Sequence, residues 1–225
     1  MRKNKRPGAA PAFRLIIFDF DGTLVDSVPS IHKNVNQMAK MYSKREVSRK
    51  RVIRAVGAGL NAFLTEIFAP ETEKMGIERV RRDYIRLYKK NHNYGLKTYP
   101  GVRGTLKYLK SKGARLAIIS NKLGLFVKSS CSYAGIRRYF SDIIGRGDFK
   151  KDKPDPFPVK HLMKKYGVPE KEVLFVGDSS YDVECAKNAG VKSVYLTFGY
   201  GDAKKTKALK PDYTFAGFRK IAGLI

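Results

Sequence analysis

The sequence predicts an α/β fold, a doubly wound parallel sheet that carries an inserted helical subdomain. Three observations predict it. Residues 13–18 form a short apolar run bounded by charge, which is typical of a buried strand. From residue 99 onward, similar apolar runs alternate with stretches of helical periodicity. Between these parts, residues 27–98 show helical spacing without a strand pattern.

The chain therefore divides into three parts. Residues 1–12 are rich in Lys, Arg, Pro and Gly and lack apolar periodicity, which predicts a basic flexible tail. Residues 13–26 and 99–225 are predicted to form the α/β core. The insert 27–98, roughly seventy residues, is too long for a crossover, which normally needs about 12 to 30. We therefore expect it to be a helical cap that stands over the end of the first strand.

Within the cap, apolar residues recur at helical spacing in three runs, and we expect Pro70 to close the second run. In the core, we expect helices that end near Gly113, Gly135, Gly167 and Gly190. Strands are expected at residues 13–18, 115–119, 142–144, 173–176 and 191–196, with an edge strand at 212–215.

Composition bounds the class of protein. A chain of 225 residues with 43 % hydrophobic residues can form one sizeable domain or a core with an inserted subdomain. Cys131 and Cys185 lack metal-ligand spacing, so we expect two buried thiols in a reducing compartment. No apolar run approaches the roughly 18 residues of a membrane helix, and no apolar signal core follows the basic start. We therefore expect a cytoplasmic protein that does not bind membranes.

The formal net charge of +26 is unusually high. The basic residues are spread along the chain rather than gathered in one arm, which favours a general property of the surface. Two alternatives remain, namely attraction of an anionic substrate or attraction of nucleic acid.

Asp19 and Asp21 directly follow the first predicted strand, and side chains two residues apart on an extended chain point the same way. Two carboxylates about 4 Å apart repel each other by roughly 4 kcal/mol at an effective dielectric constant of 20. We therefore expect a divalent cation or a shared proton between them. For an isolated Asp-x-Asp, the alternative is that one Asp caps a turn and the other is solvated.

Polar residues also follow the other predicted strands. Because ligands of such sheets bind at the carboxyl ends of the strands, these loops should meet. Ser120 and Asn121 precede a predicted helix, whose N-terminus favours an anion. Lys153 lies in the loop after the third strand, and Asp178 follows the fourth strand, with Asp182 one helical turn further on. Helix capping is the competing interpretation for Ser120 and for Asp178.

Together these segments resemble the haloacid-dehalogenase-like phosphohydrolases. The string Asp19-Phe20-Asp21-Gly22-Thr23-Leu24-Val25-Asp26-Ser27 resembles the first motif of that superfamily, Ser120 the second, Lys153 the third and Gly177–Asp182 the fourth. A helical insert between the first and second motifs is similar to that of members with a helical cap. Weaker likenesses to the phosphoglycolate-phosphatase-like branch lie at residues 56–60, 153–156 and 198–201.

The resemblance implies a role for each candidate residue. Asp19 would attack phosphorus and become an aspartyl phosphate, and Asp21 would act as general acid and then as general base. Mg²⁺ would be held by Asp19, by the backbone carbonyl of Asp21 and by Asp178. Ser120 and Lys153 would hold the phosphoryl oxygens, with Asp182 orienting Lys153 or a metal-bound water. Further candidates for substrate binding are Thr23, Asn121 and Arg54.

The sequence thus predicts a magnesium-dependent phosphomonoester hydrolase that acts on a small phosphorylated metabolite similar to phosphoglycolate. By the same resemblance, an acid at position 21 argues against dehalogenases and enzymes that cleave carbon–phosphorus bonds. One alternative is a phosphoglucomutase-like phosphoryl transferase, which would keep both acids. Another, motivated by the charge, is a nucleic-acid-associated protein, with or without end-phosphatase activity.

Overall fold

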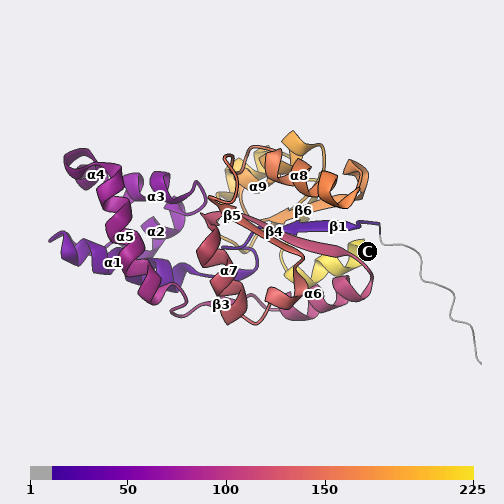
Figure 1. Ribbon diagram of the computed structural model, residues 1–225, viewed down its shortest axis with the longest axis horizontal. Helices are drawn as coiled ribbons and strands as arrows, with labels where there is room; N and C mark the ends of the chain where they lie inside the picture. Colours follow the sequence, from indigo (N-terminus) through magenta and orange to yellow (C-terminus); the bar gives the residue numbers. More distant parts are fainter. Residues whose placement is uncertain (1–11) are drawn as a thin grey trace, which may run out of the picture.

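The computed structural model of the protein describes residues 12–225. It consists of a six-stranded sheet with helices on both faces and a separate group of helices at one end (Figure 1). The predicted basic tail falls almost entirely on residues 1–11, which lie outside the described residues. Across residues 12–225, no helix is both long enough and apolar enough to cross a membrane.

Six strands form the main sheet: β1 (Leu15–Phe18), β4 (Arg115–Leu123), β5 (Asp142–Arg146), β6 (Val173–Gly177), β7 (Lys192–Leu196) and β8 (Tyr213–Phe215). Their order is β5-β4-β1-β6-β7-β8, and every neighbouring pair is parallel. The strand order reverses at β1, since the chain first builds β4 and β5 on one side and then β6 to β8 on the other. This switch point is where open parallel sheets bind their ligands.

Alternate residues of β1 face two different hydrophobic cores, which explains why its run is apolar throughout. Ile16 and Phe18 pack in the core beneath α6 (Val102–Ser111), α7 (Gly124–Tyr133) and the 3₁₀ helix η3 (Phe218–Leu224). Leu15 and Ile17 pack in the core beneath α8 (Phe157–Tyr166) and α9 (Ser180–Ala189). The short helices η1 (Arg137–Tyr139), η2 (Glu170–Glu172) and α10 (Ala203–Ala208) complete this part.

Both cysteines lie in these cores, one on each face of the sheet. Cys131 and Cys185 are buried and form no disulfide, as expected for small apolar residues.

Residues 28–91 form a helical unit with a hydrophobic core of its own (Figure 1). It contains five helices rather than the three predicted: α1 (Val28–Met41), α2 (Arg49–Ala55), α3 (Leu60–Ile67), α4 (Ala69–Met75) and α5 (Ile77–Asn91). The second predicted helix, α3, ends before Pro70 as expected, but a further helix that was not predicted begins at Ala69. Pro70 lies in the first turn of α4, where the missing N–H group costs no intrahelical hydrogen bond.

The chain enters and leaves the helical unit through two short strands that the sequence did not predict. Strands β2 (Val25–Asp26) and β3 (Lys97–Thr98) pair antiparallel beside the end of β1. The Tyr200 hydroxyl donates a hydrogen bond to the Asp26 carboxylate at 2.6 Å and accepts one from the backbone N–H of Ser27 at 2.8 Å. A residue near the C-terminus of the core thus fixes the start of the helical unit.

Candidate active site

Asp19 directly follows the buried end of β1, and its backbone N–H still bonds to the Val176 carbonyl of β6 at 2.9 Å. The turn after it depends on Gly22, which has φ +85°. A Cβ atom at Gly22 would lie 2.4 Å from an Asp178 oxygen, so only glycine fits there. This turn brings the β1 loop against the β6 loop.

Three carboxylates meet at these strand ends to form an acidic cluster of Asp19, Asp178 and Asp182. Each offers one oxygen within 4.8 Å of the others, and all three side chains are buried. Burial and the neighbouring carboxylates raise the pKa of Asp178 to about 8. Burial, opposed by Lys153 but aided by Asp182, raises the pKa of Asp19 to about 7. Protons or cations therefore bind favourably here.

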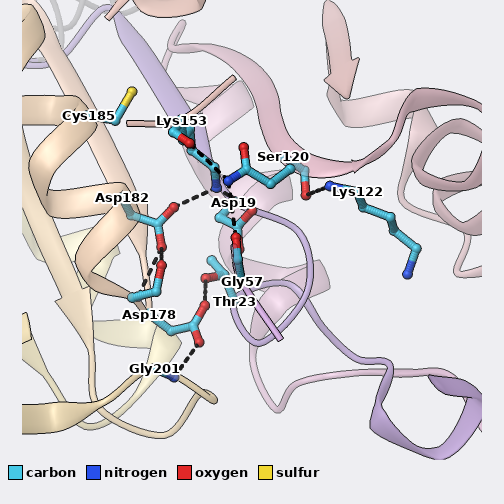
Figure 2. A network of polar contacts seen from close by, with 12 residues as sticks. Asp19, Thr23, Gly57, Ser120, Lys122, Lys153, Asp178, Asp182, Cys185 and Gly201 are labelled. Atoms are coloured by element: carbon cyan, nitrogen blue, oxygen red, sulfur yellow. Dashed lines mark hydrogen bonds and ion pairs between the residues drawn. The ribbon is translucent and has the colours of Figure 1, made fainter. Parts of the chain in front are cut away.

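Among the described residues, Lys153 carries the only ammonium group that contacts the acidic cluster. Its Nζ donates to Asp19 Oδ1 at 2.7 Å and to Asp182 Oδ1 at 2.6 Å (Figure 2). Burial alone would lower the pKa of Lys153, but the carboxylates of Asp182 and Asp19 raise it well above its ordinary value. Lys153 is therefore a fixed cation between two acids.

Asp182 is held from its other side by the start of α9. The backbone N–H and the hydroxyl of Ser179 donate to Asp182 Oδ2 at 2.9 and 2.6 Å, which completes a capping box. Capping at this loop is therefore done by Ser179 and Asp182. The competing interpretation of Asp178 as a cap is wrong, because the Asp178 carboxylate faces the cluster.

Asp178 is fixed by hydrogen bonds from two other loops (Figure 2). The Thr23 hydroxyl donates to Asp178 Oδ1 at 2.8 Å. The backbone N–H groups of Tyr200 and Gly201 donate to Asp178 Oδ2 at 2.7 and 3.2 Å. Thr23 was a candidate for substrate binding, but it is fully buried and its hydroxyl is committed to Asp178. Thr23 therefore supports the acidic cluster by fixing the Asp178 carboxylate.

The acidic cluster has the donor chemistry of a site for a hard divalent cation. Three buried carboxylates face a single ammonium group, so negative charge is in excess, and oxygen ligands are those that Mg²⁺ prefers. Asp182, assigned a supporting role, contributes a third carboxylate beside those of the predicted ligands Asp19 and Asp178. The predicted ligand atom of Asp21 is its backbone carbonyl, and its carboxylate lies outside the cluster, where it accepts a hydrogen bond from Lys122.

Strand β4 continues beyond the predicted end. Ser120 and Asn121 lie within the strand rather than at its end, and the helix that they were predicted to precede, α7, begins at Gly124. The register of β4 against β5 shifts between Ile119 and Leu123. The residues of this irregular segment line the cavity described below. Ser120 is buried and lines that cavity.

Asn121 links the helical unit to the Lys153 loop. Its Nδ2 donates to the Gly57 carbonyl at 3.1 Å and to the Lys153 carbonyl at 3.0 Å. Both N–H donors of the amide are therefore used within the protein. The predicted contact from Asn121 to substrate would have to come from Oδ1, which is buried and has no partner among the described residues.

A cavity of about 100 Å³ lies between the strand ends and the helical unit. At about 10 to 15 Å³ per water, it has room for a ligand of roughly ten non-hydrogen atoms. Arg54, a candidate substrate contact, is exposed on α2 and does not line this cavity. The core contributes Asp19, Asp21, Ser120, Lys153 and Asp178, and the helical unit contributes Ile31, Leu60, Phe63, Tyr84 and Tyr88.

Sequence reasoning missed Lys122, which lines the same cavity. Its Nζ donates to Asp21 Oδ1 at 2.9 Å, and both side chains are largely buried, with exposed fractions of 8 % and 12 %. The only sequence feature that could have identified Lys122 as a site residue is its position directly after Ser120 and Asn121. In a chain with 46 basic residues, that signal is weak.

The family model of the haloacid dehalogenase-like hydrolases matches residues 16–196, most of the chain. The chain belongs to this family. A phosphoglycolate phosphatase from Pseudomonas fluorescens is 36 % identical over 213 residues, 92 % of this chain and 78 % of that protein. Its namesake from Vibrio cholerae is 33 % identical over 90 % of this chain and 92 % of its own length.

A solved structure agrees with these relatives. The crystal structure of a predicted phosphoglycolate phosphatase from Haemophilus somnus superimposes with a TM-score of 0.88 at 31 % identity, covering 94 % of this chain and 97 % of that one. The predicted family, the α/β fold class and the assignment to an enzyme of the phosphatase class are confirmed.

Proposed function

We propose that this haloacid dehalogenase-like hydrolase is a magnesium-dependent phosphomonoester hydrolase that acts through an aspartyl phosphate on Asp19. The observation that carries the proposal is the acidic cluster. Asp19 shares it with Asp178 and Asp182, while the buried ammonium of Lys153 lies 2.7 Å from Asp19 Oδ1. The excess of buried carboxylates over ammonium groups fits a divalent cation, which would offset their repulsion of an anionic substrate.

Asp19 and Asp178 would hold the cation, with the Asp21 carbonyl as a further ligand, and bound Mg²⁺ would neutralise charge on the transferring phosphoryl group. Asp19 attacks phosphorus with one carboxylate oxygen, and the bond to the leaving oxygen breaks. Lys153 and Ser120, which both line the cavity, hold the other phosphoryl oxygens and stabilise the charge that develops there.

Asp21 donates a proton to the leaving oxygen in the first step. In the second step the Asp21 carboxylate takes a proton from the water that attacks the phosphorus of the aspartyl phosphate, which releases inorganic phosphate and restores Asp19. Asp21 lines the cavity but lies outside the acidic cluster, and this separation suits an acid–base group.

The helical unit acts in this proposal as a cap that covers the leaving group. It contributes apolar and aromatic side chains to the cavity, and Asn121 ties its Gly57 turn to the core. Exclusion of water strengthens the electrostatic contacts around the phosphoryl group. The small cavity and the names of the curated relatives support a small substrate, with phosphoglycolate as the first candidate.

Phosphate release from a panel of phosphomonoesters at fixed Mg²⁺ tests the proposal. We expect hydrolysis of small esters, loss of activity in EDTA, and a loss of about 10⁴-fold or more in Asp19→Asn, because the nucleophile is removed. Asp142→Asn, a carboxylate outside the cavity, is the matched control. Absence of phosphate release from every ester, or full activity of Asp19→Asn, would overturn the proposal. Isomerisation of sugar phosphates faster than hydrolysis would identify a mutase instead.

A further inference from the structure

The pair of Lys122 and Asp21 lies at the cavity but outside the acidic cluster. The Lys122 ammonium and the Asp21 carboxylate form an ion pair, with Nζ 2.9 Å from Oδ1 and both side chains largely buried. An ammonium group has three N–H donors. In the part of the chain that the structure describes, its Nζ donates one hydrogen bond, to Asp21 Oδ1. A buried cation with donor capacity to spare favours a second anion.

The two cations that line the cavity are placed differently. Lys153 bonds to two carboxylates of the acidic cluster, where the phosphoryl group is expected. The side chain of Lys122 extends away from Asp19, Asp178 and Asp182 (Figure 2). Its Nζ lies 5.3 Å from the centre of the Tyr88 ring of the helical unit. Lys122 is therefore the cation on the side of the leaving group.

Distances around Asp21 limit how far the second anion can lie from the ester oxygen. To protonate that oxygen, Asp21 must approach it to about 2.6 to 3.2 Å. When Asp21 Oδ1 is the oxygen that carries the proton, Lys122 Nζ, 2.9 Å from it, is within about 6 Å of the ester oxygen. In an ester of a 2-hydroxy acid, bond lengths of about 1.2 to 1.5 Å place the carboxylate oxygens roughly 3 Å from the ester oxygen. A hydrogen bond from Lys122 spans the remaining gap.

We propose that Lys122 selects phosphate esters of short 2-hydroxy acids by donating hydrogen bonds to the carboxylate of the leaving group. This inference rests on the proposed phosphatase function and assigns its substrate specificity to one residue. The walls around Lys122 are otherwise apolar or aromatic, with Phe20, Tyr88 and Phe126 nearby. A neutral leaving group would offer the spare donors of Lys122 no charged partner.

Binding without turnover tests this selectivity. In an Asp19→Asn background with Mg²⁺, calorimetry compares phosphoglycolate with 2-hydroxyethyl phosphate, which has an alcohol in place of the carboxylate. Adding Lys122→Met should weaken binding of phosphoglycolate by about 10- to 100-fold and binding of 2-hydroxyethyl phosphate by less than about threefold. Lys122→Arg, which keeps the charge, should retain a preference for phosphoglycolate. Lys128→Met, which breaks an exposed ion pair on α7, should change neither affinity.

A lysine that only positions Asp21 would give a different result. Lys122→Met would then weaken the binding of both esters to the same extent, or the Asp19→Asn protein with Lys122 intact would bind the two esters equally. Either outcome overturns the inference. Circular dichroism shows whether each variant is folded, and Lys122→Arg supplies the test if Lys122→Met is not. If Asp19→Asn binds neither ester and the wild-type protein hydrolyses none, the proposed function itself fails.

Discussion

The two lysines of the cavity lie in opposite electrostatic settings. Lys153 faces an acidic cluster in which three buried carboxylates exceed one ammonium, whereas Lys122 and Asp21 form a balanced pair beneath aromatic rings. An excess of negative charge favours the binding of a cation. In a neutral ion pair such as that of Lys122 and Asp21, by contrast, the two charges already balance each other. In the proposed function, this difference would separate phosphoryl transfer from recognition of the leaving group within one small cavity.

The largest expected effect comes from removing the cation between two acids. Lys153→Met leaves Asp19 and Asp182 as unpaired neighbours in a buried site, so we expect a stability loss of about 3 to 5 kcal/mol. Activity should fall by about 10²- to 10³-fold because an electrostatic contact to the phosphoryl group is lost. Urea unfolding and phosphate release measure the two effects.

Lys122→Met provides the other half of this comparison. Lys122 pairs with one carboxylate, whereas Lys153 pairs with two, of which Asp182 does not line the cavity. The stability loss should therefore be smaller than in Lys153→Met. Equal stability losses in Lys153→Met and Lys122→Met would contradict the proposed electrostatic difference between the two lysines.

The acidic cluster should also make stability depend on pH and on Mg²⁺. The pKa values of about 7 for Asp19 and about 8 for Asp178 lie above those of an unfolded chain, because burial favours the protonated forms. Between about pH 4 and pH 8 the folded protein therefore binds more protons than the unfolded chain, and its unfolding free energy falls as the pH rises. In EDTA we expect the Tm to drop by about 5 °C or more from pH 6 to pH 8.

Mg²⁺ should reverse this trend, because it binds the ionised carboxylates and displaces their protons. The Tm gain from Mg²⁺ should be larger at pH 8 than at pH 6, and it should disappear in Asp178→Asn. A Tm in EDTA that rises from pH 6 to pH 8 would contradict the raised pKa values. Differential scanning calorimetry in the four conditions measures both trends.

The smallest effect concerns the contact between the two parts of the chain. Tyr200→Phe removes a hydroxyl that bonds to Asp26 and to the backbone of Ser27, while the backbone bond from residue 200 to Asp178 remains. We expect a stability loss of about 1 to 2 kcal/mol with little change in Mg²⁺ affinity. A large loss of Mg²⁺ affinity would mean that the start of the helical unit and the acidic cluster are coupled.

Much of the core could be predicted from the sequence because its determinants are local. Each strand of the sheet is an apolar run with polar flanks, and the rule that ligands bind at strand ends places Asp19, Lys153 and Asp178 together. The helical unit was less predictable. Helices α2 and α4 have seven residues each, too few for a clear period of 3.6. Helix α2 is stabilised by Val52 and Ala55 in the unit's own core, and α4 packs against α3 and α5.

The missed residues depend on partners that are distant in sequence. Lys122 lies 101 positions from Asp21, and Tyr200 lies 174 positions from Asp26. Neither residue type stands out in a chain with 46 basic residues and 13 tyrosines. The internal partners of Thr23 and Asn121 were missed for the same reason, since Asp178 and the Gly57 and Lys153 carbonyls come from other loops.

The central claim is that Asp19 carries the phosphoryl group between two steps that Asp21 serves as acid and as base. Rapid acid quenching of Asp21→Asn with labelled 4-nitrophenyl phosphate tests it most directly, because this leaving group needs no protonation and the second step lacks its base. We expect labelled phosphate to accumulate on the Asp19 peptide of Asp21→Asn and to be absent when Asp19→Asn is added. Turnover of the ester by the wild-type protein with no label on Asp19 in either protein would contradict it.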